Sequence, residues 1–256
     1  MSRPVFLVPA ATLTGRRVGD QVAVTGSEAR HAIRARRLRP GERVDLVDGS
    51  GGRGTAEITD LDAVTDTLRA QLMQFTIEPA PEVDLALVQA LGKGGRDELA
   101  VEMSTEVGAG QITPWQSARA VSRWRGAKVD GGRQRWQQIA TAAAKQARRS
   151  HFPEVQPLVV GDDLVDVVTR ACAQGEVVLI LHEEAATPIG EVRLQGAHRI
   201  SVVVGPEGGL TPDEVTALRA AGGQPVRLGP HVLRTSTAGP VALALVADHL
   251  GHWARD

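Results

Sequence analysis

The chain has 256 residues, of which 42% are hydrophobic and 23% are charged. It is therefore long enough for one or two globular domains and too apolar to be disordered. Its formal charge of −1 does not by itself predict nucleic-acid binding, and its single cysteine, Cys172, excludes a disulfide framework and a cysteine-rich metal site. The apolar stretch at 5–13 is too short to span a membrane and follows a single arginine. We therefore expect no signal peptide, no membrane segment, no metal and a cytoplasmic location.

Residues 1–74 show mainly β-strand patterns separated by turn residues, which predicts a small β-barrel domain. The segment at 49–55 carries the two glycines of a P-loop but lacks its lysine, so we interpret it as a hairpin turn. A Pro-rich segment at 75–82 is predicted to be a linker. The predicted elements of the first domain are strands at 21–24, 43–47, 54–58 and 68–74 and a short helix at 27–38.

Residues 83–256 form the second predicted domain, in which strands and helices alternate. This alternation predicts an α/β fold with a mostly parallel sheet covered on both faces. The helix at 238–250 is apolar on nearly every side and is expected to be buried, with Pro240 tolerated in its first turn. The other predicted elements are strands at 83–90, 112–115, 177–181, 200–204 and 225–228 and helices at 96–107 and 133–147.

The charges are segregated along the chain. Residues 119–149 hold nine basic residues against one acidic residue, and residues 28–43 hold six arginines against two glutamates. Two such runs favour an RNA-binding face, because a guanidinium binds phosphate with two hydrogen bonds and stacks on bases. An ordinary solvated arginine-rich surface is the alternative. The arginines assigned to RNA binding are Arg34, Arg36, Arg37, Arg39, Arg123, Arg125, Arg135, Arg148 and Arg149.

A loop at 205–210 joins a buried strand to a helix whose start is marked by Thr211, Pro212 and Glu214. Open α/β sheets bind ligands at the carboxyl ends of such strands, although a tight glycine turn is the alternative. Glu207 in this loop would repel a phosphate, so a cationic or hydroxyl-rich ligand suits it better. A side chain added at Gly208 is expected to obstruct that ligand.

A second loop, at 228–238, also follows a strand and enters a helix. Arg234 in this loop needs an anionic partner, which a structural ion pair would also satisfy. The hydroxyls at 235–237 offer a helix N-cap as the alternative to a ligand role. With the strand end at 181–183, the two loops are expected to line one crevice.

Five segments, in chain order, resemble the RsmE family of bacterial small-subunit rRNA uridine-N3 methyltransferases, which belongs to the SPOUT class. GPEGGLTPDEV and LGPHVLRTSTA, at 205–215 and 228–238, are the specific part of the match. His231, Ser236 and the pair Gly239-Pro240 depart from the family pattern, so no catalytic carboxylate is assigned at 236. The other matching segments are HAIRARRLRPGERV at 31–44, QALGKGGRDELAVEMSTEVGAGQITPW at 89–115 and RWQQIATAAAKQARRSHFPEV at 135–155.

The resemblance implies an α/β SPOUT methyltransferase domain with a trefoil knot, preceded by a PUA-like barrel that grips RNA. It implies S-adenosyl-L-methionine as cofactor, a uridine N3 of 16S rRNA in the small ribosomal subunit as target, and a homodimer. Arg234 would stabilise charge on the uracil oxygen, and Glu207 is a candidate base. The implied cofactor-binding residues are Leu181, His182, Gly205, Pro206, Glu207, Gly208, Gly209, Leu228, Gly229, Leu233, Arg234, Thr235 and Thr237.

Two other functions remain open at this point. One is a SPOUT ribose 2′-O-methyltransferase, which would modify a different atom of the nucleotide. The other is a non-catalytic RNA-binding or ribosome-assembly protein that keeps the knot without turning over a substrate.

Overall fold

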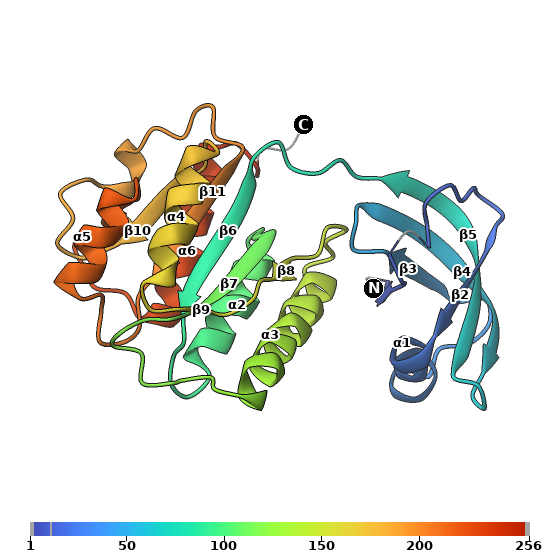
Figure 1. Cartoon of the computed structure of the whole chain (residues 1–256). Helices are drawn as coiled ribbons and strands as arrows, with labels where there is room; N and C mark the ends of the chain where they lie inside the picture. The colour runs from blue at the N-terminus through green and yellow to red at the C-terminus, as the bar shows by residue number, and fades with distance from the viewer. Residues whose placement is uncertain (1–2, 11, 254–256) are drawn as a thin grey trace. The chain divides into compact units, whose positions relative to one another are not determined.

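The computed structural model describes residues 3–10 and 12–253 and divides the chain into two compact units (Figure 1). Unit 1 comprises Met1–Ala80 together with Ala144–Phe152, and unit 2 comprises Pro81–Ala143 with Pro153–Asp256. The sequence pattern predicts 144–152 in the second domain instead. The difference arises because this segment makes hydrogen bonds with residues of unit 1.

The added segment is fastened to unit 1 by backbone and side-chain contacts. The Ser150 carbonyl accepts a hydrogen bond from Gly51 N–H at 3.1 Å, and His151 Nε2 bonds the Glu78 carbonyl at 2.9 Å. Ser150 is only 2% exposed. Gly51 is required here, because a Cβ at this position would lie 2.5 Å from the Glu78 carbonyl and its φ is +101°.

Unit 1 is built on a five-stranded sheet of order β1-β3-β4-β5-β2. Its core holds Phe6, Leu46, Ile58 and Leu68. All four predicted strands are present, whereas β1, which pairs in parallel with β3, was not predicted. The predicted linker was placed too early, because pairing with β4 continues β5 to Ile77. The strands are β1 (Val5–Leu7), β2 (Gln21–Thr25), β3 (Arg43–Val47), β4 (Gly52–Asp62) and β5 (Thr67–Ile77).

The helix predicted at 27–38 is shorter and less regular than expected. It consists of α1 (Gly26–Arg30) followed by a π-helical turn, η1 (His31–Ala35). Arg37 then adopts a φ of +53°, so the chain leaves the helix there. The arginines after η1 therefore lie on a turn and not on a helix face.

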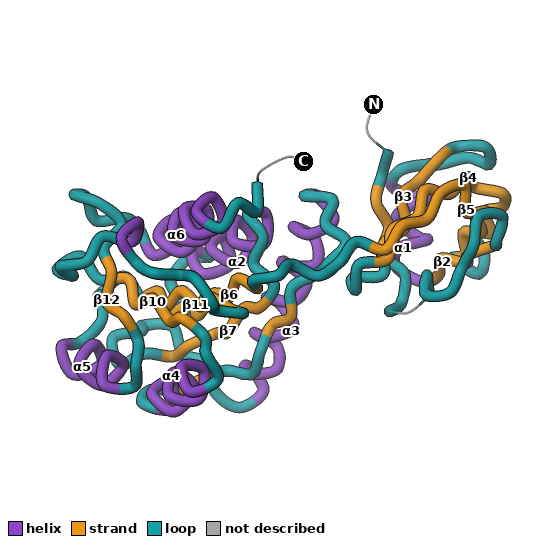
Figure 2. The backbone as a smooth tube through the Cα atoms, turned by 90° about the horizontal axis from the view of Figure 1, so that it is seen from above, coloured by secondary structure: helices purple, strands orange, loops and turns teal. Residues whose placement is uncertain are grey.

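Unit 2 is an α/β fold with an all-parallel sheet of order β12-β10-β11-β6-β7-β8, in which β9 also pairs with β7. Helices α2 and α6 cover one face, and α4 and α5 cover the other (Figure 2). This arrangement agrees with the prediction of a parallel sheet covered on both faces. The strands are β6 (Asp84–Ala90), β7 (Gln111–Gln116), β8 (Glu154–Val155), β9 (Val159–Val160), β10 (Val177–Leu181), β11 (Arg199–Val204) and β12 (Gln224–Val226).

The helices of unit 2 differ from the prediction in number and length. No element was predicted at α4, and the 3₁₀ turn η2 (Ile189–Glu191) was also missed. Helix α6 begins at Thr235, so Pro240 lies in its second turn and removes one intrahelical hydrogen bond there. The helices are α2 (Arg96–Glu106), α3 (Ala127–Gln146), α4 (Asp163–Ala173), α5 (Pro212–Ala220) and α6 (Thr235–His249).

Candidate functional site

A pocket of about 490 Å³ lies in unit 2, where the loops after β10, β11 and β12 meet. Its volume is typical of sites for small organic molecules. All the residues predicted to bind a cofactor line it except Thr237, which lies inside α6. The predicted residues that line it are Leu181, His182, Gly205, Pro206, Glu207, Gly208, Gly209, Leu228, Gly229, Leu233, Arg234 and Thr235.

The wall after β11 is the loop at 205–210, and its exit into α5 is fixed by a capping box. Glu214 N–H donates to Thr211 Oγ1 at 3.1 Å, and Thr211 N–H donates to Glu214 Oε2 at 2.8 Å. Gly209 adopts a φ of +69°, which a residue with a Cβ disfavours. The sequence predicted this helix start and the turn before it.

Arg119 holds the same loop from outside the pocket. Its guanidinium donates to the carbonyls of Gly208 and Leu210 at 3.0 and 3.2 Å. A Cβ built on Gly208 would lie 3.4 Å from Arg119 Cβ, so a side chain at 208 would meet Arg119; that it would also obstruct a ligand stays a prediction.

Glu207 is occupied by contacts within the protein. Its Oε1 accepts a hydrogen bond from Lys93 N–H at 2.9 Å and lies 3.4 Å from Arg96 Nη1. Burial alone would raise the pKa of the Glu207 carboxyl, but these donors, with its own backbone N–H, hold that pKa below its usual value. A weakened basicity argues against Glu207 as the base and favours a role in fixing the loop.

The loop that faces Glu207 is itself held by a buried carboxylate. Asp97, at the start of α2, accepts hydrogen bonds from Gly92 N–H at 3.1 Å and Glu98 N–H at 2.9 Å. Burial raises the pKa of the Asp97 carboxyl in spite of these bonds. The sequence pointed to neither Asp97 nor Arg96, since both lie in a helix with no unusual pattern.

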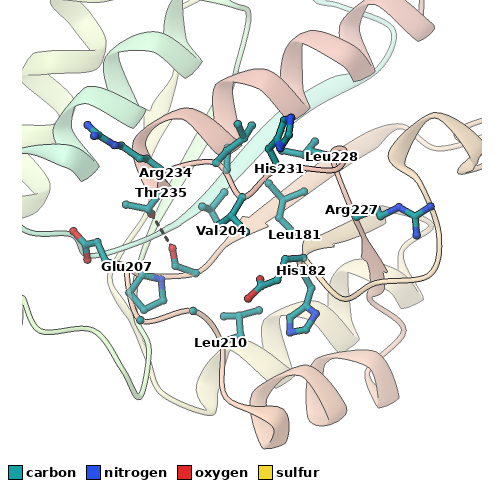
Figure 3. A pocket seen from close by; sticks show the side chains of 18 of the residues that line it. Leu181, His182, Val204, Glu207, Leu210, Arg227, Leu228, His231, Arg234 and Thr235 are labelled. Carbon is teal, nitrogen blue, oxygen red and sulfur yellow. Dashed lines mark hydrogen bonds between the residues drawn. The ribbon is translucent and has the colours of Figure 1, made fainter.

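Arg234 lies at the rim of the pocket and is exposed. Figure 3 shows its side chain extending away from Leu181 and Leu228. Within the described ranges, no ion pair involves Arg234, so the alternative of a structural ion pair has no support. The guanidinium is therefore free to meet an incoming anionic group.

Thr235 does not cap α6, which was the alternative interpretation of its hydroxyl. The residue at the N-cap position is Arg234, and it makes no side-chain capping bond. The Thr235 hydroxyl donates to the Gly205 carbonyl at 2.8 Å (Figure 3). It also accepts a hydrogen bond from Gln89 Nε2 at 2.9 Å. It thereby ties the start of α6 to the loop after β11.

The arginines predicted to bind RNA differ in how free their side chains are. Arg34 pairs with Asp66 at 3.3 Å, and Arg135 pairs with Glu98 at 3.1 Å. Arg123 donates to the Ala118 carbonyl at 3.2 Å. Arg149 is half-buried. Of these predicted arginines, the ones that are exposed and enter no ion pair in the part of the chain the structure describes are Arg36, Arg37, Arg39, Arg123, Arg125 and Arg148.

The two tryptophans in the basic run serve packing. Trp136 is 1% exposed, and Trp124 meets it edge-on with ring centroids 5.3 Å apart.

Among the described residues, no group of three or more His, Cys, Asp or Glu could hold a metal ion, and no helix is long and apolar enough to cross a membrane.

Comparison with known proteins places these features in a class. Residues 78–247 match the family model of an RNA methyltransferase domain, and residues 24–64 match that of an RNA methyltransferase PUA domain. A structure from Legionella pneumophila, 24% identical, has the same fold with a TM-score of 0.84 over 97% of this chain and 98% of its own. The chain thus combines a PUA domain with an RNA methyltransferase domain.

Individual relatives show which family of RNA methyltransferases the chain resembles. Ribosomal RNA small subunit methyltransferase E from Mycobacterium bovis is 43% identical over 92% of this chain and 89% of its own, and the Bacillus subtilis protein of that name is 28% identical over 88% and 89%. The crystal structure of the Neisseria gonorrhoeae protein of that name, bound to S-adenosyl methionine, is 28% identical, with a TM-score of 0.84 over 97% of this chain and 98% of its own. The chain belongs to the ribosomal RNA small subunit methyltransferase E family, in agreement with the resemblance in its sequence.

Proposed function

We propose that this protein methylates N3 of a uridine in 16S rRNA, with S-adenosylmethionine as the methyl donor. The observation that carries the proposal is the pocket into which three strand-end loops converge in a member of this family. The Neisseria gonorrhoeae relative, whose fold matches over nearly the whole chain, binds S-adenosyl methionine. The SPOUT knot, which the resemblance implies, is part of this proposal.

The residues of the pocket fit this cofactor chemically. Leu181, Val204, Leu228 and Leu233 offer apolar surface for an adenine ring, and the two loops offer backbone N–H and carbonyl groups for hydroxyl, amino and carboxylate groups. Glu207 argues against a phosphate-bearing cofactor in the same place. S-adenosylmethionine, when bound, supplies a methyl group on a positively charged sulfur.

In the reaction, the bond from the methyl carbon to N3 forms as the carbon–sulfur bond breaks. The N3 proton must leave, and negative charge develops on the uracil oxygens. We assign the stabilisation of that charge to Arg234, which is exposed at the rim. N3 lies on the Watson–Crick edge, so the uracil must be unpaired or flipped out of a helix.

The decisive experiment incubates the purified protein with S-adenosylmethionine and either 16S rRNA or small ribosomal subunits, followed by nucleoside mass spectrometry. The proposal predicts 3-methyluridine. A 2′-O-methylated nucleoside would identify a ribose methyltransferase instead. Binding of S-adenosylmethionine with no methylation of either substrate would favour a non-catalytic assembly protein.

We further propose that the arginines after η1 bind phosphate groups of the rRNA backbone. Arg36, Arg37 and Arg39 are exposed and unpaired within the described residues. Removing one phosphate-binding side chain lowers the slope of log K against log salt by roughly 0.7 to 0.9, so alanine at all three should lower it by about 2.1 to 2.7. Alanine at Arg16 and Arg17, which are also exposed in the same unit, should leave the slope unchanged. Equal slopes for both variants would contradict this role.

A homodimer in the cytoplasm completes the proposal. Helices α2 and α6 cover the same face of the sheet and expose Leu99 and Leu245, each 45% exposed. Apolar side chains on adjacent helices favour burial against a second copy. Light scattering should give a dimer at micromolar concentration, and a stable monomer would refute this part of the proposal.

A further inference from the structure

We infer that Gln89 is a positioning residue for the cofactor pocket, acting through Thr235; this inference rests on the proposed function. Gln89 is fully buried near the carboxyl end of β6. In the sheet it lies beside Val204, the residue immediately before the loop at 205–210. It does not itself line the pocket.

A chain of hydrogen bonds runs from Gln89 to both walls of the pocket. Gln89 Nε2 donates to Thr235 Oγ1 at 2.9 Å, and Thr235 Oγ1 donates to the Gly205 carbonyl at 2.8 Å. Thr235 and Gly205 both line the pocket, one at the start of α6 and the other after β11. The three residues therefore join the central strand β6 to two of the loops that form the site.

The direction of this chain follows from proton count. A threonine hydroxyl has one proton, and the bond to the Gly205 carbonyl uses it. Toward Gln89 the hydroxyl is therefore an acceptor, so Gln89 must present its NH₂ group, which also donates to the Ala90 carbonyl at 3.1 Å. Only an amide or another donor at position 89 satisfies this arrangement.

The carbonyl oxygen of the Gln89 amide lowers the stability of the protein. Gln89 Oε1 is buried and has no hydrogen-bond partner among the described residues. An unpaired buried acceptor lowers stability, and an apolar side chain of similar size, such as methionine, would avoid that cost. The amide is therefore explained by its bond to Thr235 and not by a contribution to the core.

The inference is tested by calorimetric titration of S-adenosylmethionine into Gln89→Met. We expect a melting temperature no lower than that of the unaltered chain, with a dissociation constant about 3 to 10 times larger, the effect of one net hydrogen bond. Ser104→Ala is the matched control, because it removes another buried oxygen without a partner, on α2 outside the pocket. It should leave the dissociation constant unchanged.

A double-mutant cycle decides whether the effect passes through Thr235. Thr235→Val removes the hydroxyl and Thr235→Ser keeps it, so only the valine variant should weaken binding strongly. In the Thr235→Val background, Gln89→Met should add nothing further. If Gln89→Met does not fold, the valine and serine variants still test the same bonds.

Unchanged affinity in folded Gln89→Met, or equal losses with and without the Thr235 hydroxyl, would overturn the inference. Failure of the unaltered chain to bind S-adenosylmethionine is a different result. It would remove the proposed function, and the inference would fall with it.

Discussion

Replacing Arg119 with alanine should weaken S-adenosylmethionine binding, although Arg119 lies outside the pocket. The side chain lies behind the loop at 205–210 and bonds the carbonyls of Gly208 and Leu210 at 3.0 and 3.2 Å. A hydrogen bond from a charged donor contributes about 1.5 to 3 kcal/mol when shielded from water. Because Arg119 is exposed, we take about 1 to 2 kcal/mol for both bonds together.

Without these bonds, the loop at 205–210 leaves its binding conformation in a fraction of the molecules. The apparent dissociation constant rises as the fraction of molecules with the loop in its binding conformation falls. We therefore expect up to about a 5- to 30-fold larger dissociation constant by calorimetry. Arg123→Ala is the matched control, because it removes an equal charge whose hydrogen bond goes to the Ala118 carbonyl. Equal affinities for Arg119→Ala and the unaltered chain, or an equal loss in Arg123→Ala, would refute the reasoning.

Arg234→Ala should lower turnover more than it raises the cofactor dissociation constant, because its proposed partner is charge that develops during the reaction; a loss confined to cofactor affinity would contradict this. Asp97→Asn should change how stability depends on pH. The folded carboxyl keeps its proton above its ordinary pKa of 3.8, so the free energy of unfolding should fall as pH rises through the window above that value. Urea unfolding across the acid range should show this decline in the unaltered chain and not in the asparagine variant.

The elements that the sequence predicted are those with local signals. Thr211, Pro212 and Glu214 mark the start of α5 with a capping box that the structure contains. By contrast, α4 has no side-chain capping bond and is rich in valine, which favours strands, so no helix was predicted there. β1 is three residues long and depends on its pairing with β3, which is distant in the sequence. The position of 144–152 in unit 1 likewise rests on long-range hydrogen bonds.

The features of the site likewise divide into those with a local sequence signal and those that depend on long-range contacts. The three loops were predictable because each follows a buried strand, and parallel strands end at the same edge of a sheet. The roles of Arg119 and Gln89 were not predictable, because each depends on a bond to a residue far away in the sequence. Arg119 bonds Gly208, at a separation of 89 positions, and Gln89 bonds Thr235, at a separation of 146 positions. The sequence does mark the glycines at 208 and 209, but it does not show that Arg119 lies beside Gly208.

The membership of Ala144–Phe152 in unit 1 has a consequence for synthesis of the protein. When Ala80 leaves the ribosome, the PUA unit still lacks the segment that bonds Gly51 and Glu78. Roughly seventy more residues must be translated first, which takes about 4 to 14 s at the usual rates. During that time the backbone groups of Gly51 and Glu78 are hydrated, and the first strands of the methyltransferase sheet are already being made. The PUA unit can therefore complete these contacts only after Pro81–Ala143, the first and smaller part of the methyltransferase unit, has been translated.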